Sequence, residues 1–266
     1  MTGRWVCLLY HDVVADVSRP ATGPRRFAVQ DRSFEEQLDL IRDCGYNGCS
    51  IATALTTATE RPLAISFDDG DLGQFTAAFP ALVARGMTAT FFVTTSWVGK
   101  PGYVNWDQLR EMKCAGMSVQ SHTRTHPFLS ELDAQALGEE LRGSKAELDD
   151  ALEQTTDMLA LPGGDFPPST LRRIVRESGY RVVATSRWGS NGGVASGRAE
   201  PLYLRRCTVR GMPSPEHVRR ILAGDRWLGG QRRLREAVLS AMRRSLGPSR
   251  YARWRRHVLD ALVRVT

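Results

Sequence analysis

Short apolar runs that stop at polar residues alternate along this 266-residue chain with segments of helical pattern. Apolar runs of this length, bounded by turn signals, are typical of buried strands. Buried strands that alternate with helices predict an α/β fold with a parallel sheet, either closed or doubly wound. We expect about seven strands, at Trp5–Leu9, Leu63–Phe67, Thr88–Val93, Met117–Gln120, Asp157–Leu161, Arg181–Thr185 and Leu202–Val209.

The positions of the polar residues favour the closed form of this sheet. The candidate functional residues lie just past the C-terminal ends of predicted strands, except for Arg206, which lies in the last strand. Those past a strand end are His11, Asp68, Asp69, His122, His126, Gly163 and Trp188. A barrel gathers the carboxyl ends of its strands around one mouth. An open sheet would leave several of these side chains too far apart to act together. The sequence therefore predicts a barrel.

Two adjacent acids, Asp68 and Asp69, follow the strand Leu63–Phe67 and precede Gly70. Neighbouring carboxylates repel each other, so a fold that holds both at a strand end is expected to use them. One can bind a cation, and the other, kept ionised by that cation, can act as a base. The alternative is that the acids, or Asp71, only cap the following helix.

A histidine pair, His122 and His126, follows the strand Met117–Gln120. Residues at i and i+4 meet on one helical face or in a tight turn, and neutral imidazole is the commonest metal ligand. Two histidines and one carboxylate make a three-ligand site with an open position for water. The alternative is that the pair only decorates the surface.

Three segments together carry a resemblance to a known family. Residues 66–70 read Ser-Phe-Asp-Asp-Gly, residues 122–126 read His-Thr-Arg-Thr-His, and residues 10–13 read Tyr-His-Asp-Val. From about residue 5 to residue 211 the chain resembles the polysaccharide deacetylases, carbohydrate esterase family 4, which share the nodulation-type deacetylase homology domain. The Tyr-His-x-Val opening is similar to that of one branch. The resemblance implies an irregular (β/α)7 barrel.

The resemblance also implies roles for single residues. Asp69, His122 and His126 would be the metal ligands, Asp68 the catalytic base, and the backbone N–H of Gly163 an oxyanion donor. A divalent ion of this ligand set acts as a Lewis acid and lowers the pKa of water. Zn²⁺ suits two nitrogen ligands and one oxygen, although Co²⁺, Ni²⁺, Fe²⁺ or Mn²⁺ could fill the site.

Two departures from the family pattern bear on the mechanism. Ala160 stands where relatives often have an arginine that orients the base, and residues 204–209 lack the histidine that often protonates the departing amine. We infer that Arg206 steadies Asp68 instead. The leaving-group acid is then either His11 or Asp68 after it has taken a proton, and His11 could also be a core residue.

Trp188 completes the set of candidate site residues. We assign Trp188, with Arg206, to the substrate-binding side of the site, because the apolar face of a pyranose stacks on indole rings; Trp97 is a similar candidate. Core packing is an equally good interpretation of either tryptophan.

The basic charge of the chain lies in its C-terminal segment. The net charge is +7, and residues 231–266 alone carry ten arginines against two acids. We divide the chain into a barrel domain, 1–228, and an Arg-rich helical tail, 229–266. Apolar stripes backed by arginine predict either packing on the barrel or contact with an anionic membrane. Nucleic acid is not expected as a partner.

The localisation expected is cytoplasmic, with a peripheral membrane contact through the tail as an option. The five cysteines lack metal-type spacing and fit reduced thiols rather than a disulfide framework. No apolar run approaches the roughly 18 residues of a membrane span, and the start is too short for a signal peptide.

These observations predict a metal-dependent N-deacetylase acting on an N-acetylated amino sugar in a glycan or glycoconjugate. One rival is an amide hydrolase of the same scaffold with another substrate, such as a cyclic ureide. A second rival is a binding protein that uses its basic tail on membrane or nucleic acid with an inert barrel. The intact Asp68-Asp69 and His122/His126 set argues against inertness, because binding alone would not need it.

Overall fold

The structure is a computed structural model. It describes residues 4–16, 27–56, 62–164, 169–192, 200–209, 214–224, 229–230, 238, 241–242 and 245. Almost all of the Arg-rich tail lies outside these residues, so the expected tail helices and their membrane contact stay predictions. Within the described residues, no helix has the length and apolar character needed to cross a membrane.

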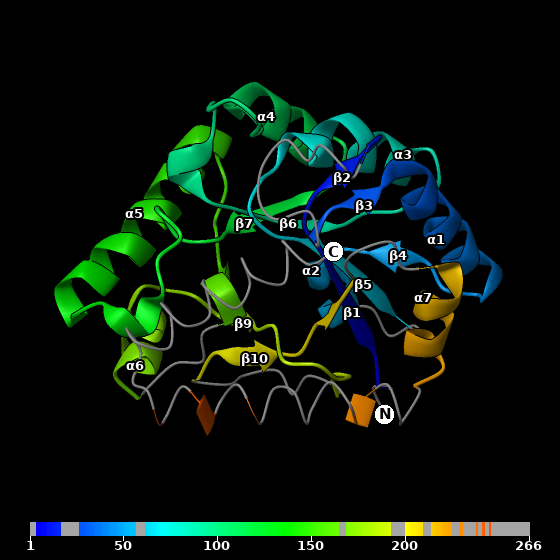
Figure 1. The fold of residues 1–266 in the computed structure, drawn as a ribbon. Coiled ribbons are helices and arrows are strands. Elements are labelled where there is room, and N and C mark those ends of the chain that lie inside the picture. Colours follow the sequence, from blue (N-terminus) through cyan, green and yellow to red (C-terminus); the bar gives the residue numbers. More distant parts are fainter. Residues whose placement is uncertain are drawn as a thin grey trace.

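The described residues alternate strands and helices, as the sequence predicts (Figure 1). The strands are β1 (Val6–Tyr10), β2 (Val13–Val14), β3 (Val29–Gln30), β4 (Gly48–Cys49), β5 (Leu63–Phe67), β6 (Thr90–Val93), β7 (Ser118–Ser121), β8 (Met158–Ala160), β9 (Val182–Ala184), β10 (Leu202–Leu204) and β11 (Cys207–Thr208). The helices are α1 (Asp31–Asp43), α2 (Ile51–Thr56), α3 (Phe79–Val83), α4 (Trp106–Cys114), α5 (Ala134–Leu152), α6 (Ser169–Glu177) and α7 (Pro215–Leu222), with a π-helical turn at Gln74–Ala78.

One curled parallel sheet forms the centre of the fold. Its order is β10-β9-β8-β7-β6-β5-β1-β11, with β4 paired to β5 at the end where β5 begins. In Figure 1, α1, α3, α4 and α5 form an arch around the outside of these strands. The sheet closes through one segment of chain, because β10 pairs with β9 whereas β11, only two residues later, pairs with β1. The predicted (β/α)7 barrel is confirmed.

All seven predicted strands are present, and each observed end lies within two residues of the predicted end. The last one is interrupted at residues 205–206, where it changes partner from β9 to β1. The sequence reasoning missed the two-residue strands β2, β3 and β4, which are too short to show a period.

Two of the helices differ in how they begin. Asn105 caps α4, since its side chain accepts from the Gln108 N–H and the Gln108 side chain accepts from the Asn105 N–H. The run Ser33-Phe34-Glu35-Glu36 has the pattern of a capping box but does not form one. Helix α1 begins earlier, at Asp31, with Gln30 extended at the N-cap and no side-chain cap.

Candidate active site

The two acids lie at the carboxyl end of β5, where the neighbouring strand holds their backbone. The Asp68 N–H donates to the Tyr10 carbonyl of β1 at 3.1 Å. The buried Gln74 amide donates to the carbonyl of Asp68 at 2.5 Å and to that of His11 at 3.1 Å. Asp69 follows in a left-handed conformation with φ 81°. Because non-glycine residues rarely adopt this conformation, it indicates a functional constraint on the position of the Asp69 side chain.

The two histidines come from the next strand but one. Strand β7 ends at Ser121, and the His122 N–H donates to the Val93 carbonyl at the end of β6, at 2.9 Å. The His122 ring places Nδ1 3.0 Å from the Ala160 carbonyl of β8. This contact assigns the proton to Nδ1 and leaves Nε2 with its lone pair. The His126 ring lies beside that of His122, with 4.9 Å between their centroids.

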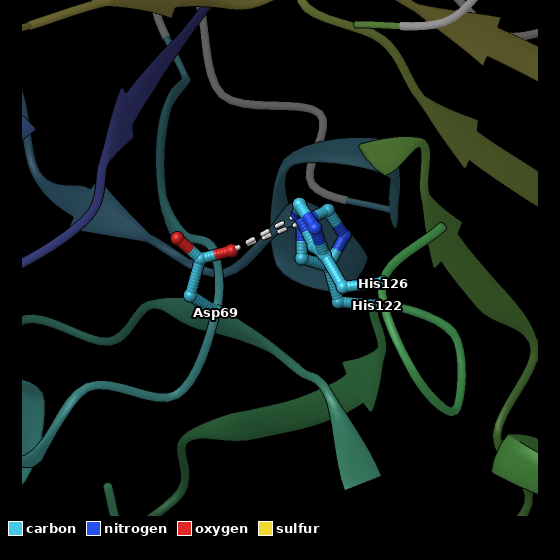
Figure 2. Close-up of side chains that lie close together, drawn as sticks. All are labelled: Asp69, His122 and His126. Carbon is cyan, nitrogen blue, oxygen red and sulfur yellow. Dashed lines mark ion pairs between the residues drawn. The ribbon is translucent and has the colours of Figure 1, made fainter. Parts of the chain in front are cut away.

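Asp69, His122 and His126 converge on one point (Figure 2). Asp69 Oδ1 is 3.3 Å from His122 Nε2 and 3.4 Å from His126 Nε2. The three ligand atoms lie within 4.8 Å of one another. Asp69 Oδ1 is buried and has no hydrogen-bond donor among the described residues. A carboxylate oxygen and two imidazole nitrogens that face each other without a donor between them fit a divalent cation.

The charges of this cluster depend on one another. Burial would raise the pKa of Asp69, yet His122, His11 and His126 together lower it well below its usual range. Burial would likewise lower the pKa of His122, yet the charges of Asp68 and Asp69 outweigh it and raise that pKa. For His126, burial and then the charge of His122 lower the pKa to about 4. A cluster that holds an ionised carboxylate against imidazole is prepared for positive charge.

Asp68 faces a different partner, Arg206. The Arg206 guanidinium donates to both oxygens of Asp68, at 2.6 Å to Oδ1 and 2.8 Å to Oδ2. Asp68 is 3 % exposed and Arg206 is 0 % exposed, so the pair is shielded from water. Although burial acts to raise the pKa of Asp68, the charge and hydrogen bonds of Arg206, together with the charges of His122 and His11, outweigh it and lower the pKa. Asp68 is therefore held as a carboxylate, 3.9 Å from His122 Nε2.

Arg206 is fixed by the interruption of the last strand. Its Nε donates to the Thr185 carbonyl at 3.0 Å, and its backbone N–H donates to the Arg187 carbonyl at 2.9 Å. Its guanidinium carbon lies 5.4 Å from the centre of the Phe92 ring. With every one of these contacts internal and no exposed surface, Arg206 supports Asp68. Its expected direct contact with substrate finds no support here.

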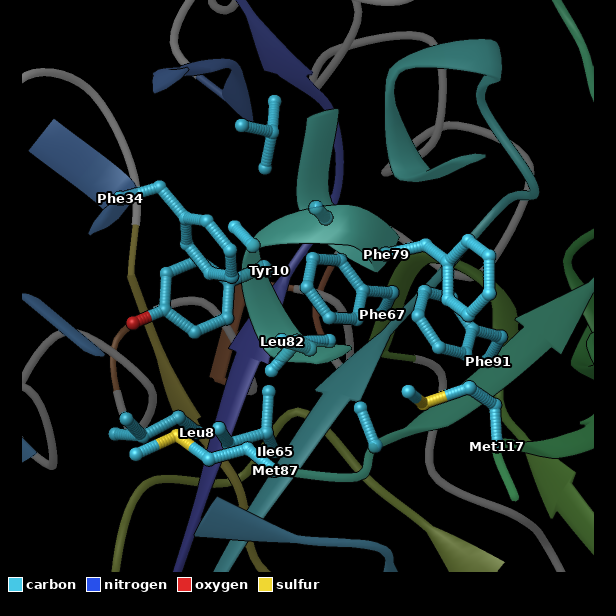
Figure 3. Packing of buried hydrophobic residues seen from close by; sticks show 14 of the residues in the cluster. Leu8, Tyr10, Phe34, Ile65, Phe67, Phe79, Leu82, Met87, Phe91 and Met117 are labelled. Carbon is cyan, nitrogen blue, oxygen red and sulfur yellow. The ribbon is translucent and has the colours of Figure 1, made fainter. Parts of the chain in front are cut away.

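Aromatic packing beneath the acids keeps the strand ends in place. The ring of Phe67, directly before Asp68, stacks on Phe91 of β6 at 4.7 Å and on Tyr10 of β1 at 5.5 Å between centroids. Phe34 of α1 meets both Tyr10 and Phe67 edge-on. Figure 3 shows these rings as one layer of the core. Such packing restrains the strands from which the acids project.

The remaining candidates lie in different surroundings. His11 stands at the end of β1 in the field of Asp69 and Asp68; burial is the main cause of its lowered pKa. Trp188 is 8 % exposed and belongs to the main core cluster, which favours its packing role over stacking on a sugar. Trp97 instead lies over the site, with its ring 5.1 Å from that of His126.

Gly163 follows β8, in a left-handed conformation with φ 62°. A Cβ at this position would clash with Cε1 of Phe128, so the glycine is required by both backbone and packing. This geometry explains the glycine, and its role as oxyanion donor stays a prediction.

Two buried acids near the site, Asp12 and Asp71, were not assigned a chemical role from the sequence. Burial is the main cause that raises the pKa of Asp12 to about 6 and that of Asp71 to about 9. The charge of Asp69 adds to both shifts. Gln74 was missed as well, because a single glutamine in a helical segment gives no signal of the carbonyls it will bridge.

Comparison with known proteins agrees with this geometry. The sequence profile of the family described as polysaccharide deacetylase matches residues 56–183, which contain both acids and both histidines. This match supports the polysaccharide deacetylase family for the chain. It agrees with the predicted family, whose members are hydrolases that act on acetamide bonds.

Individual relatives support the assignment to the polysaccharide deacetylases. YxkH of Bacillus subtilis (strain 168), provisionally named a polysaccharide deacetylase, is 28% identical over 189 residues, covering 69% of this chain and 64% of YxkH. The match therefore spans less than two thirds of that relative. Among solved structures, the Streptococcus pyogenes deacetylase PplD in complex with acetate is similar with a TM-score of 0.72 and 27% identity, over 84% of this chain and 99% of PplD. IcaB from Ammonifex degensii is similar with a TM-score of 0.65 and 26% identity, over 83% of this chain and 96% of IcaB.

Proposed function

We propose that this polysaccharide deacetylase is a metal-dependent N-deacetylase that hydrolyses the acetamide of an N-acetylated amino sugar in a glycan or glycoconjugate. The observation that carries the proposal is the adjacency of two differently prepared carboxylates. Asp69 faces two imidazoles, whereas Asp68 is ionised and bound at both oxygens by Arg206. The similar PplD structure is a complex with acetate, which is the acid that such a reaction would release.

The metal would be held by Asp69, His122 and His126, and Zn²⁺ is the ion that best suits their donor atoms. When bound, such an ion polarises the acetamide carbonyl and makes a water molecule more acidic. Asp68 has the position and charge of a general base, so it takes the proton from the attacking water. Arg206 keeps that carboxylate in one orientation, since both of its terminal nitrogens are engaged.

The departing amine needs a proton, and Asp68 is the group that has just received one. We assign Asp68 as the group that donates this proton to the departing amine, because the donation restores the carboxylate in each cycle. His11 suits the role less well, since its burial lowers its pKa and keeps the imidazole neutral near pH 7. The Gly163 N–H, beyond β8, would donate to the oxyanion of the tetrahedral intermediate.

The proposal is tested by acetate release from N-acetylglucosamine oligomers by the metal-loaded protein, with cyclic ureide hydrolysis measured in parallel. Asp68→Asn should keep the metal and lose turnover, because an amide can hydrogen-bond water but cannot take its proton. Asp107→Asn is a matched control, since the Asp107 side chain is 92% exposed on α4. Deacetylation by Asp68→Asn at the parent rate would refute the assignment of the base, and ureide hydrolysis without acetate release would refute the substrate class.

A further inference from the structure

The loop that joins the two histidines has an unfavourable backbone. Both Thr123, with φ 68°, and His126, with φ 62°, are left-handed although neither is a glycine. The loop therefore needs contacts that hold it in this shape. One such contact lies within the loop, where the His126 N–H donates to Thr123 Oγ1 at 3.1 Å. Another comes from the segment after β6, where the Ser96 N–H donates to the Arg124 carbonyl at 2.9 Å.

Glu140, on helix α5, accepts three hydrogen bonds from this loop. Its Oε2 accepts from the backbone N–H of Arg124 at 2.9 Å and from that of Thr125 at 2.8 Å. Its Oε1 accepts from the Thr125 hydroxyl at 2.6 Å. Successive backbone N–H groups that point to one place form a concave site for an anion. Here a carboxylate of the same chain fills that site with three charge-assisted hydrogen bonds, which are stronger than neutral ones.

These contacts lie on the two residues directly before His126. Helix α5 is anchored independently of the loop, because its Leu137, Leu141 and Leu148 are buried. A carboxylate fixed on a rigid helix therefore sets where the loop backbone lies, and the backbone sets where the His126 ring lies. His122 differs, since its own ring is held by the Ala160 carbonyl at 3.0 Å.

We propose that Glu140 is a positioning residue for His126, and that it sets the affinity of the site for a divalent metal ion through the backbone of the Arg124-Thr125 loop. The inference rests on the proposed metal site. Groups that orient a metal ligand change metal affinity by about 10–100-fold when they are removed. Glu140 acts one step further from the metal, through the peptide chain, so we expect the lower end of this range.

The same helix provides a matched control, Glu147. Its Oε1 accepts from Arg124 Nε at 2.8 Å, so it also binds the loop, but through a side chain rather than through backbone N–H groups. Its side chain is 35% exposed, and that of Arg124 is 54% exposed. Removing Glu147 should therefore leave the backbone of the loop, and the metal affinity, unchanged.

The test measures Co²⁺ affinity of metal-free protein by competition with a chromophoric chelator, with the visible spectrum of bound Co²⁺ as a second readout. Glu140→Ala should raise the Kd about 10-fold and alter the spectrum. Glu140→Gln keeps an acceptor oxygen and should fall between this variant and the parent. Glu147→Ala should stay within about twofold of the parent. Equal Kd values for Glu140→Ala and the parent, or an equal loss in Glu147→Ala, would overturn the proposal.

Amide hydrogen exchange separates this proposal from the proposed function. The N–H groups of Arg124 and Thr125 should exchange faster in Glu140→Ala than in the parent or in Glu147→Ala, because their acceptor is gone. Unchanged exchange at both amides would overturn the proposed hold on the loop. If the parent binds metal with the predicted Glu140 dependence and yet releases no acetate from any acetylated glycan, only the proposed function fails.

Discussion

Replacing Arg206 with methionine should be among the most disruptive single changes in the barrel. The variant leaves the Asp68 carboxylate 3 % exposed and without the two hydrogen bonds, of 2.6 and 2.8 Å, that now bind its oxygens. Removing one partner of a buried ion pair costs about 3–5 kcal/mol, because the other charge stays buried and uncompensated. Methionine is long enough to fill much of the space, so the cavity contribution should be small.

The loss should depend on pH in a defined direction. In the parent, Arg206 lowers the pKa of Asp68, so this group contributes stability above its unfolded pKa that is lost as the pH falls through its folded pKa. In Arg206→Met burial dominates, and the pKa of Asp68 rises above its unfolded value. The stability difference should then be largest at neutral and alkaline pH and should shrink as the pH falls and Asp68 becomes protonated. The acidic limb of the pH–rate profile should move upward for the same reason.

Urea unfolding and the pH dependence of kcat test this reasoning, with a double variant as the control. Arg206→Met combined with Asp68→Asn removes both charges, so it should recover most of the lost stability while remaining inactive. Arg206→Lys keeps the charge without the bidentate geometry and should lie between the parent and Arg206→Met. A loss below about 1 kcal/mol in Arg206→Met with an unchanged pH–rate profile, or a double variant as unstable as Arg206→Met, would refute the argument.

Three further outcomes are expected. In metal-free protein, Asp12→Asn should have a higher Tm than the parent above about pH 6 and the same Tm near pH 4. The pKa of Asp12 is raised to about 6, so its ionisation lowers the free energy of unfolding of the parent as the pH rises, by up to about 3 kcal/mol. Gly163→Ala should lower the free energy of unfolding in urea by about 1 kcal/mol or more and should lower kcat. Because the new Cβ would clash with the Phe128 ring, adding Phe128→Ala should recover the part of this loss that comes from the clash. The full chain should float with anionic vesicles at low salt and release them at high salt, whereas a protein ending at Ala223 should not bind; full-length protein that ignores such vesicles would remove the membrane hypothesis.

The sequence alone predicted the fold and singled out the residues of the candidate site. Buried strands that end in polar residues predicted a parallel barrel, because hydrophobic runs and their boundaries are local properties of the chain. The same boundaries marked Asp68, Asp69, His122 and His126 as neighbours, since parallel strands bring their carboxyl ends to one edge. The family resemblance assigned roles to these residues, and the strand ends explain why they lie together.

Only the tertiary structure decided how these residues are held. The sequence suggested that Arg206 steadies Asp68, but nothing in the spacing of the two residues requires the two hydrogen bonds between their side chains. These form because the last strand breaks and changes partner there. The burial of Trp188 could not be read from the sequence either, because a tryptophan after a strand can pack inward or face a ligand. Glu140 gave no signal, as one acid in the charged helix α5, until its oxygens met the backbone of the histidine loop. Contacts of this kind join segments far apart in the chain, so they depend on packing distances that local sequence patterns do not encode.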